Sequence, residues 1–318
     1  MQNFDKEIDN MIFISKKKDQ RPLSSASILF FGYSEVGYAC LEYLLGRGAN
    51  IVGVFTHIDN PNENHWFRSV PDLALSRNLK TFTPDSLKET SIQETIRDLK
   101  PDIILSCYYR NMVPLQILEI PRLGAFNMHG SLLPKYRGRA PINWAILNGE
   151  KETGATLHVM VAKADAGDII DQKSFPIEKT DTALLVTKKM CDAAVAILDR
   201  SLLNLIEGKA IRIKQNDAEA TYYSGRKPED GRIDWQWPAD RIYNLIRAVT
   251  KPFPGAFADF ENGRLLVWGA TPPSSVPSLV PTQCDEKPVP GTILSENPLL
   301  IQTGTGCLEI TDFEWISP

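Results

Sequence analysis

The sequence predicts an α/β protein with a parallel-rich sheet, followed by a smaller, mostly β domain. From residue 27 to about residue 210, short and fully apolar runs alternate with amphipathic segments. This alternation is typical of βαβ units whose sheet is covered by helices on both faces. Beyond that point helical runs become scarce, and proline and glycine separate the apolar runs. A length of 318 residues also favours two domains over one.

The elements of the first domain follow from hydrophobic periodicity. The expected strands are 28–31, 51–55, 102–107, 124–128, 155–161 and 168–175, and the expected helices are 35–45, 86–99, 142–147 and 182–206. The first 26 residues are polar and are expected to form an extension outside the fold. We therefore expect three parts: the extension (1–26), a catalytic domain (27–210) and a second domain (211–318).

The second domain is expected to contain one helix and several short strands. The predicted helix is 244–249, and the predicted strands are 256–260, 265–268, 292–294, 299–302 and 307–310. A connection rich in proline and serine, residues 271–290, divides these strands into two groups. Such a composition is typical of a small β domain.

The bulk composition excludes several classes of protein. The net charge of −4 is unfavourable for a protein that grips nucleic acid through its phosphates. No apolar run is long enough for a membrane span, and the N-terminal segment lacks the features of a signal peptide. The five cysteines are scattered, which predicts reduced thiols in a cytoplasmic protein. No cysteine or histidine pair has metal-ligand spacing, so no metal site is expected.

The first candidate site is a pair of polar residues at the end of a predicted strand. Asn127 and His129 are two residues apart, so their side chains face the same way at a carboxyl edge of the sheet. An amide can stabilise an oxyanion and an imidazole can move a proton, as acyl transfer requires. Taken alone, however, this spacing favours two residues that satisfy backbone groups at the end of a strand.

Three further residues near this pair could contribute to a site. Asp165 lies in a turn and could orient His129, although an ordinary Asx-turn explains it as well. Arg137 and Arg139 flank a glycine in the loop after the strand, and guanidinium groups suit carboxylates and phosphates. His158 lies among apolar residues in a predicted strand, so a buried structural histidine is expected there.

Four ordered motifs give the sequence a close resemblance to a known family. They begin at Asn127, Tyr136, Asn148 and Asp165, and they read N-x-H-x-S-L-L-P, Y-R-G-x-A-P, N-G-E-x-x-T-G-x-T and D-x-G-D-I. In this order they resemble the 10-formyltetrahydrofolate-dependent formyltransferases. The resemblance runs from about Ile28 to the C-terminus and implies a Rossmann-like domain followed by an OB-like β-barrel.

The resemblance also implies roles for individual residues. Asn127, His129 and Asp165 would be catalytic, and 10-formyltetrahydrofolate would be the formyl donor. The folate would lie along one further set of residues: Asn111, Met112, Val113, Arg139, Val161, Ala162, Lys163, Ala164 and Asp165. The side chains of residues 111–113 differ from those of other members, which matters little if the folate is held there by backbone groups.

The expected acceptor is the amine of a nucleotide-linked amino sugar. Within the family, the chain resembles the formyltransferase domain of the bifunctional polymyxin-resistance protein, which formylates UDP-4-amino-4-deoxy-L-arabinose in lipid A modification. The motif F-T-H-x-D-N-P from Phe55, the run Tyr108–Arg110 and the pair Leu157–His158 fit that subfamily. We expect no counterpart of the second catalytic domain of that bifunctional protein.

Several alternatives to this acceptor stay open. Methionyl-tRNA formyltransferase shares the motifs, but residues 212–318 hold ten Lys and Arg against fourteen Asp and Glu, a poor surface for tRNA. A dTDP- or GDP-linked 4-amino sugar is another acceptor. Hydrolysis of the folate, with water as the acceptor, fits an OB-like second domain less well. A protein that binds the folate or a nucleotide without catalysis would not need the intact set of Asn127, His129 and Asp165. We expect no nucleic acid partner and no membrane insertion. The sequence does not decide whether the protein forms a homo-oligomer.

Overall fold

The computed structural model describes residues 23–61, 64–261, 263–275 and 288–317. The predicted N-terminal extension therefore lies outside the described residues as far as residue 22. Its last four residues do not behave as an extension, because Leu23 and Ala26 are buried in the core. Leu23–Ser25 forms a single 3₁₀ turn (η1) just before the first strand.

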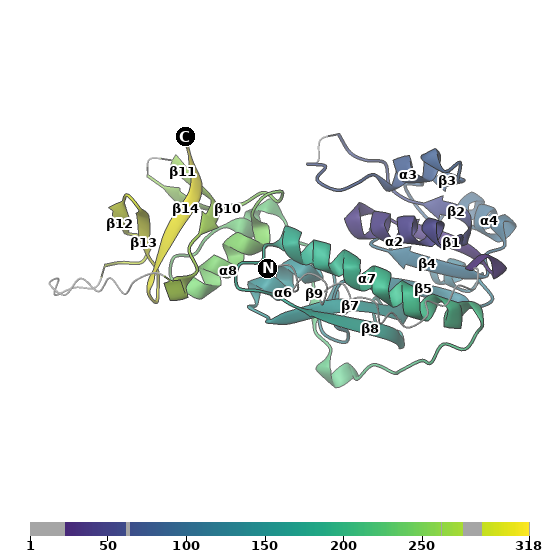
Figure 1. The fold of residues 1–318 in the computed structure, drawn as a ribbon. Coiled ribbons are helices and arrows are strands. Elements are labelled where there is room, and N and C mark those ends of the chain that lie inside the picture. Colours follow the sequence, from purple (N-terminus) through teal and green to yellow (C-terminus); the bar gives the residue numbers. More distant parts are fainter. Residues whose placement is uncertain (1–22, 62–63, 262, 276–287, 318) are drawn as a thin grey trace, which may run out of the picture.

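A seven-stranded sheet forms the centre of the larger part of the molecule (Figure 1). Its strand order is β3-β2-β1-β4-β5-β7-β8. The first five of these strands are parallel, whereas β7 is antiparallel to β5 and β8 is antiparallel to β7. The bounds are β1 Ser27–Gly32, β2 Asn50–Phe55, β3 Thr81–Phe82, β4 Ile103–Cys107, β5 Gly124–His129, β7 Glu152–Val159 and β8 Ile169–Pro176.

Helices cover both faces of this sheet, which is why β1 and β4 at its centre consist mainly of buried apolar residues. One face carries α2 (Ser34–Gly46), α3 (Val70–Ser76) and the long α7 (Ala183–Ile206). The other face carries α4 (Thr90–Leu99) and the short α5 (Leu115–Leu118). These two helical layers confirm the α/β architecture that the sequence predicts. Neither α3 nor α5 was among the predicted helices.

The smaller part is a helix packed on an antiparallel sheet, at the left of Figure 1. The sheet has the order β10-β11-β14-β13-β12. Its strands are β10 Ala256–Phe260, β11 Gly263–Ala270, β12 Ile293–Glu296, β13 Leu299–Gln302 and β14 Cys307–Ile316. The helix α8 (Ala239–Val249) starts five residues before its predicted beginning and packs on α6 (Pro141–Leu147) of the larger part. Most of the predicted 271–290 connection lies outside the described residues.

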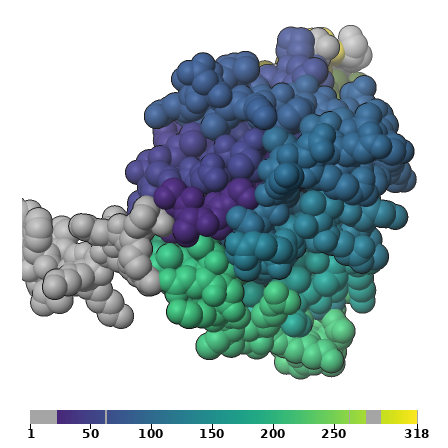
Figure 2. Space-filling model, turned by 90° about the vertical axis from the view of Figure 1, so that its right-hand side faces the viewer, coloured from purple at the N-terminus to yellow at the C-terminus, as the bar shows by residue number. Residues whose placement is uncertain are grey.

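The segment after α7 belongs structurally to the larger part. Ile213 exchanges backbone hydrogen bonds with Ile169, and the strand β9 (Tyr222–Tyr223) pairs with β6 (Arg137–Gly138). In Figure 2 the green residues, which include the end of α7 and the segment after it, lie directly beside the purple residues around β1. We therefore propose that the boundary between the two domains lies after Tyr223 and not after residue 210.

Candidate active site

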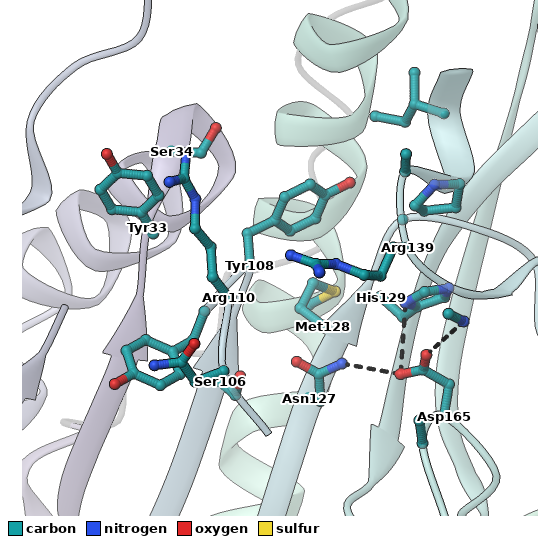
Figure 3. A pocket seen from close by; sticks show the side chains of 18 of the residues that line it. Tyr33, Ser34, Ser106, Tyr108, Arg110, Asn127, Met128, His129, Arg139 and Asp165 are labelled. Carbon is teal, nitrogen blue, oxygen red and sulfur yellow. Dashed lines mark hydrogen bonds and ion pairs between the residues drawn. The ribbon is translucent and has the colours of Figure 1, made fainter. Parts of the chain in front are cut away.

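A cavity opens at the carboxyl ends of β1, β4 and β5 (Figure 3). The strand order reverses between β1 and β4, and open α/β sheets bind their ligands at such a point. The cavity has a volume of about 580 Å³. Seven described non-glycine residues have positive φ, and four of them line the cavity: Ser34, Tyr108, Ala140 and Asp165. Such backbone strain is concentrated at functional sites.

The structure brings the three predicted catalytic residues together. Asn127 and His129 project from the end of β5, and Asp165 lies in the turn between β7 and β8. His129 Nδ1 is 3.6 Å from Asp165 Oδ1, and Asn127 Nδ2 is 3.5 Å from the same oxygen. Figure 3 shows all three facing the cavity, with the dashed lines converging on the Asp165 carboxylate.

Hydrogen bonding fixes the tautomer of His129. Its Nε2 is 2.7 Å from the carbonyl oxygen of Tyr136, which can only accept, so Nε2 carries a hydrogen. The neutral ring therefore presents an unprotonated Nδ1 to the cavity. Burial lowers the pKa of His129, and the nearby Asp165 carboxylate offsets only part of that effect. The ring is thus prepared to accept a proton at neutral pH.

The carboxylate of Asp165 stays ionised although it is largely buried. Burial by itself raises the pKa of this carboxyl, but His129, His158 and the backbone N–H of Gly138 outweigh burial and lower the pKa. That N–H donates to Asp165 Oδ2 at 2.9 Å. An ionised Asp165 beside a neutral His129 can stabilise the imidazolium that forms when His129 takes a proton.

Arg137 does not face the cavity, contrary to the suggestion that it could bind an anion. Its side chain is fully buried, and it donates to Gln215 Oε1 from Nε at 3.0 Å and from Nη2 at 2.7 Å. Gln215 Nε2 in turn donates to the carbonyl oxygens of Asp165, at 2.8 Å, and Gly167, at 2.7 Å. A buried guanidinium needs partners of this kind. Arg137 therefore holds the catalytic turn through Gln215.

The residues expected to contact the folate form one wall of the cavity. Seven of the nine line it: Asn111, Met112, Val113, Arg139, Val161, Ala164 and Asp165. Ala162 and Lys163 do not line it, and Lys163 Nζ instead lies 5.2 Å from the centre of the Tyr222 ring. Within the described residues, the Arg139 side chain has no hydrogen bond or ion pair, which leaves its guanidinium available to a ligand.

A second group of lining residues, which we call the aromatic wall, was not predicted from the sequence and is largely aromatic. Tyr33, Trp66, Phe67 and Phe253 line it together with Arg110. The Arg110 guanidinium lies 4.4 Å from the centre of the Tyr33 ring, as Figure 3 shows from the side. Phe253 comes from the smaller part of the molecule, nearly two hundred residues along the chain from Trp66. No local motif could have predicted that these side chains meet.

Two other histidines lie in or beside the site. His158 is buried, as expected, but it also lines the cavity between Asn127 and Asp165. His57 stacks on Tyr109 at a centroid distance of 4.3 Å, and its Nε2 accepts the Arg110 backbone N–H at 3.1 Å. Burial, with a smaller effect from the Arg110 charge, lowers the pKa of His57 to about 4. This neutral ring holds the backbone of the turn that carries Arg110.

Among the described residues, no three His, Cys, Asp or Glu side chains are grouped so that they could hold a metal ion. Within the same ranges, no helix combines the length and apolar character needed to cross a bilayer.

Comparison with family models gives two matches that together cover most of the chain. Residues 28–202 match the formyl transferase model, and residues 226–316 match the model of the formyl transferase C-terminal domain. The chain belongs to the formyl transferase family. This formyl transferase is accordingly an enzyme that transfers a formyl group. The interval between the two matches contains the 213–223 segment that packs on the catalytic part.

Solved structures with the same fold include enzymes with different acceptors. An N-formyltransferase from Helicobacter canadensis, complexed with folinic acid and dTDP-3-aminofucose, aligns with a TM-score of 0.66 at 22% identity, over 90% of this chain and 99% of that one. WlaRD, a sugar 3N-formyl transferase with dTDP and 5-N-formyl-THF, gives 0.58 at 24%, over 76% and 93%. Methionyl-tRNA formyltransferase from Clostridium thermocellum gives 0.56 at 18%, over 92% and 99%. At these identities the likeness establishes the fold and leaves the acceptor open.

Proposed function

We propose that this formyl transferase moves the formyl group of 10-formyltetrahydrofolate to the amine of a nucleotide-linked amino sugar. The observation that carries the proposal is that one cavity joins the Asn127–His129–Asp165 cluster to two chemically different walls. The finer assignment, to UDP-4-amino-4-deoxy-L-arabinose, rests on the sequence resemblance to the polymyxin-resistance enzyme.

The wall that holds Met112, Val113 and Val161 fits a folate. Met112 and Val161 are 61% and 39% exposed, so a flat apolar ring system would cover surface that is otherwise in contact with water. Arg139 at the same wall suits a carboxylate of the glutamate tail. The formylated folates in two of the aligned structures agree with this choice of donor.

The aromatic wall fits the nucleotide part of the acceptor. Trp66, Phe67 and Phe253 offer faces on which a base can stack, and Arg110 offers charge to a diphosphate. The acidic balance of residues 212–318 supports a small acceptor over tRNA, whose binding would need basic phosphate contacts. We therefore place the nucleotide sugar on this side, with its amine towards His129.

Each member of the trio has a separate task in the proposed reaction. When bound, the folate supplies a formyl carbon that the acceptor amine can attack. Asn127 donates an N–H to the formyl oxygen as negative charge develops on it. His129 Nδ1 takes the proton from the attacking amine and returns it to the departing folate nitrogen. Asp165 stabilises His129 while it is charged.

A panel of acceptors tests the proposal. The enzyme is given 10-formyltetrahydrofolate with UDP-, dTDP- and GDP-linked 4-amino sugars or with charged initiator tRNA, and mass spectrometry identifies the formylated product. We expect formylated UDP-4-amino-4-deoxy-L-arabinose, and none from the His129→Ala variant. Product from tRNA alone would contradict the acceptor class. Product from a dTDP-linked sugar alone would support a nucleotide-linked amino sugar as the acceptor but would show that its nucleotide is dTDP and not UDP.

A further inference from the structure

His158 faces the catalytic asparagine from the neighbouring strand. In the antiparallel pair of β5 and β7, Asn127 and His158 are directly opposite each other, so both side chains point to the same face of the sheet. His158 is 2% exposed, and it lines the cavity next to Asp165. No step of the proposed reaction involves this residue.

The hydrogen bonds of His158 define what it offers to the site. Its Nδ1 is 2.9 Å from the carbonyl oxygen of Val159, which can only accept, so Nδ1 carries the hydrogen whenever the ring has only one. The unprotonated Nε2 is therefore an acceptor, and it lies 3.2 Å from Asn127 Nδ2. A buried acceptor of this kind selects which end of the neighbouring amide faces it.

The amide of Asn127 has two orientations that differ by a flip of oxygen and nitrogen. The nitrogen lies 3.2 Å from His158 Nε2 but 3.5 Å from Asp165 Oδ1, a distance at the limit of hydrogen bonding. His158 therefore makes the stronger of the two contacts that hold the nitrogen in place. The flipped amide would turn its own oxygen towards the negative charge that develops during transfer.

The two histidines of the site have different tasks although their surroundings are alike. Each ring is tied to a backbone carbonyl through one nitrogen and approaches Asp165 Oδ1 with the other, at 3.6 Å for His129 and 3.4 Å for His158. In His158 that second nitrogen already accepts from Asn127, whereas no group among the described residues donates a hydrogen bond to His129 Nδ1. His129 is thus the ring left to take a proton.

We propose that His158 is a positioning residue: it accepts one N–H of the Asn127 amide and thereby directs the other N–H at the formyl oxygen. This proposal rests on the role of Asn127 in the proposed function. Removing one oxyanion donor lowers kcat by about 100- to 1,000-fold in other enzymes, and a misplaced donor should cost part of that. Because the amide acts on developing charge, loss of His158 should lower kcat and leave both KM values nearly unchanged.

The test compares two substitutions at residue 158, each alone and combined with Asn127→Ala. His158→Leu removes the acceptor, and we expect kcat to fall by about tenfold or more. His158→Gln can present an amide oxygen to Asn127, and we expect it to recover most of kcat. In the Asn127→Ala background, His158→Leu should cause little further loss, because its target is already gone. Thermal unfolding checks that each variant is folded, and His158→Met replaces the leucine variant if that one is not.

The outcomes separate the two proposals. A His158→Leu enzyme with unchanged kcat, a glutamine variant as impaired as the leucine variant, or an equal loss in the Asn127→Ala background would each overturn the positioning role. In those cases Asn127→Ala would still lose activity. Wild-type kcat in Asn127→Ala itself would instead overturn the proposed function of the trio.

Discussion

A single carboxylate organises the chemistry of this formyl transferase at the scale of residues. Asp165 Oδ1 lies within 3.6 Å of nitrogens from Asn127, His129 and His158, while its other oxygen accepts from the backbone of Gly138. Three side chains from two strands thus share one negative charge. The protonation state of His129 should therefore depend directly on Asp165.

The pH profile of kcat tests whether Asp165 controls the protonation state of His129. His129 must be neutral to take a proton, and burial lowers its pKa below the usual value of about 6.5. We expect kcat to fall as the pH drops through that lowered pKa, with a midpoint below 6.5. In Asp165→Asn the charge that raises the pKa of His129 is gone, so the midpoint should move to still lower pH while the maximal kcat falls. A midpoint that moves upward would contradict the assignment.

At the scale of elements, two short strands hold the catalytic turn. The pair β6 and β9 brings Tyr223 against Gly138, whose N–H reaches Asp165. Gly138 has a φ of +100°, and a Cβ there would overlap the carbonyl oxygen of Tyr223. Only a residue without a side chain allows the two strands to approach this closely.

We expect Gly138→Ala to lower kcat by about tenfold or more while the enzyme stays folded, because the Asp165 anchor is displaced. Steady-state kinetics and thermal unfolding measure the two effects. Gly46→Ala is the matched control: it lies at the end of α2, where a Cβ meets nothing within 4 Å. It should leave kcat unchanged. Equal kinetics for the two variants would show that the close approach of β6 and β9 is dispensable.

The sequence predicts elements better than it predicts the contacts between them. The apolar runs located six of the seven strands of the large sheet, since burial on both faces leaves a strong pattern, whereas the two-residue edge strand β3 was missed. The motif residues Asn127 and His129 were placed correctly on one face of a strand end. The role of Arg137 was misjudged, because its partner Gln215 lies 78 residues away and no local pattern records that pairing. The short helix α3 has little periodicity of its own and was missed.

At the scale of the whole molecule, the two domains share one cavity. Asn64 Nδ2 donates to the backbone oxygen of Pro252 at 2.9 Å, and the rings of Trp66 and Phe253 lie 5.7 Å apart. The smaller domain thereby completes the aromatic wall on which we place the nucleotide. The folate wall, in contrast, is built by the larger domain alone.

Substitutions in the two walls should separate the two substrates. Phe253→Ala removes part of the proposed stacking surface and should raise KM for the nucleotide sugar severalfold, since a stacked base is worth about 1–3 kcal/mol. It should leave KM for the folate unchanged. Met112→Ala should do the reverse. Initial rates measured over a grid of both substrate concentrations give the KM of each variant for each substrate. The same KM change in both variants would contradict the assignment of the walls.

The packing of residues 213–223 limits how this family can exchange domains by recombination. A crossover directly after Ala210 would replace Gln215 by the corresponding residue of the other parent. The carbonyl oxygens of Asp165 and Gly167 would then keep their hydrogen bonds only if that residue could donate in the same way. A crossover after Tyr223 would carry the catalytic turn and its support as one inherited unit. Viable chimeras between relatives should therefore share junctions beyond this segment.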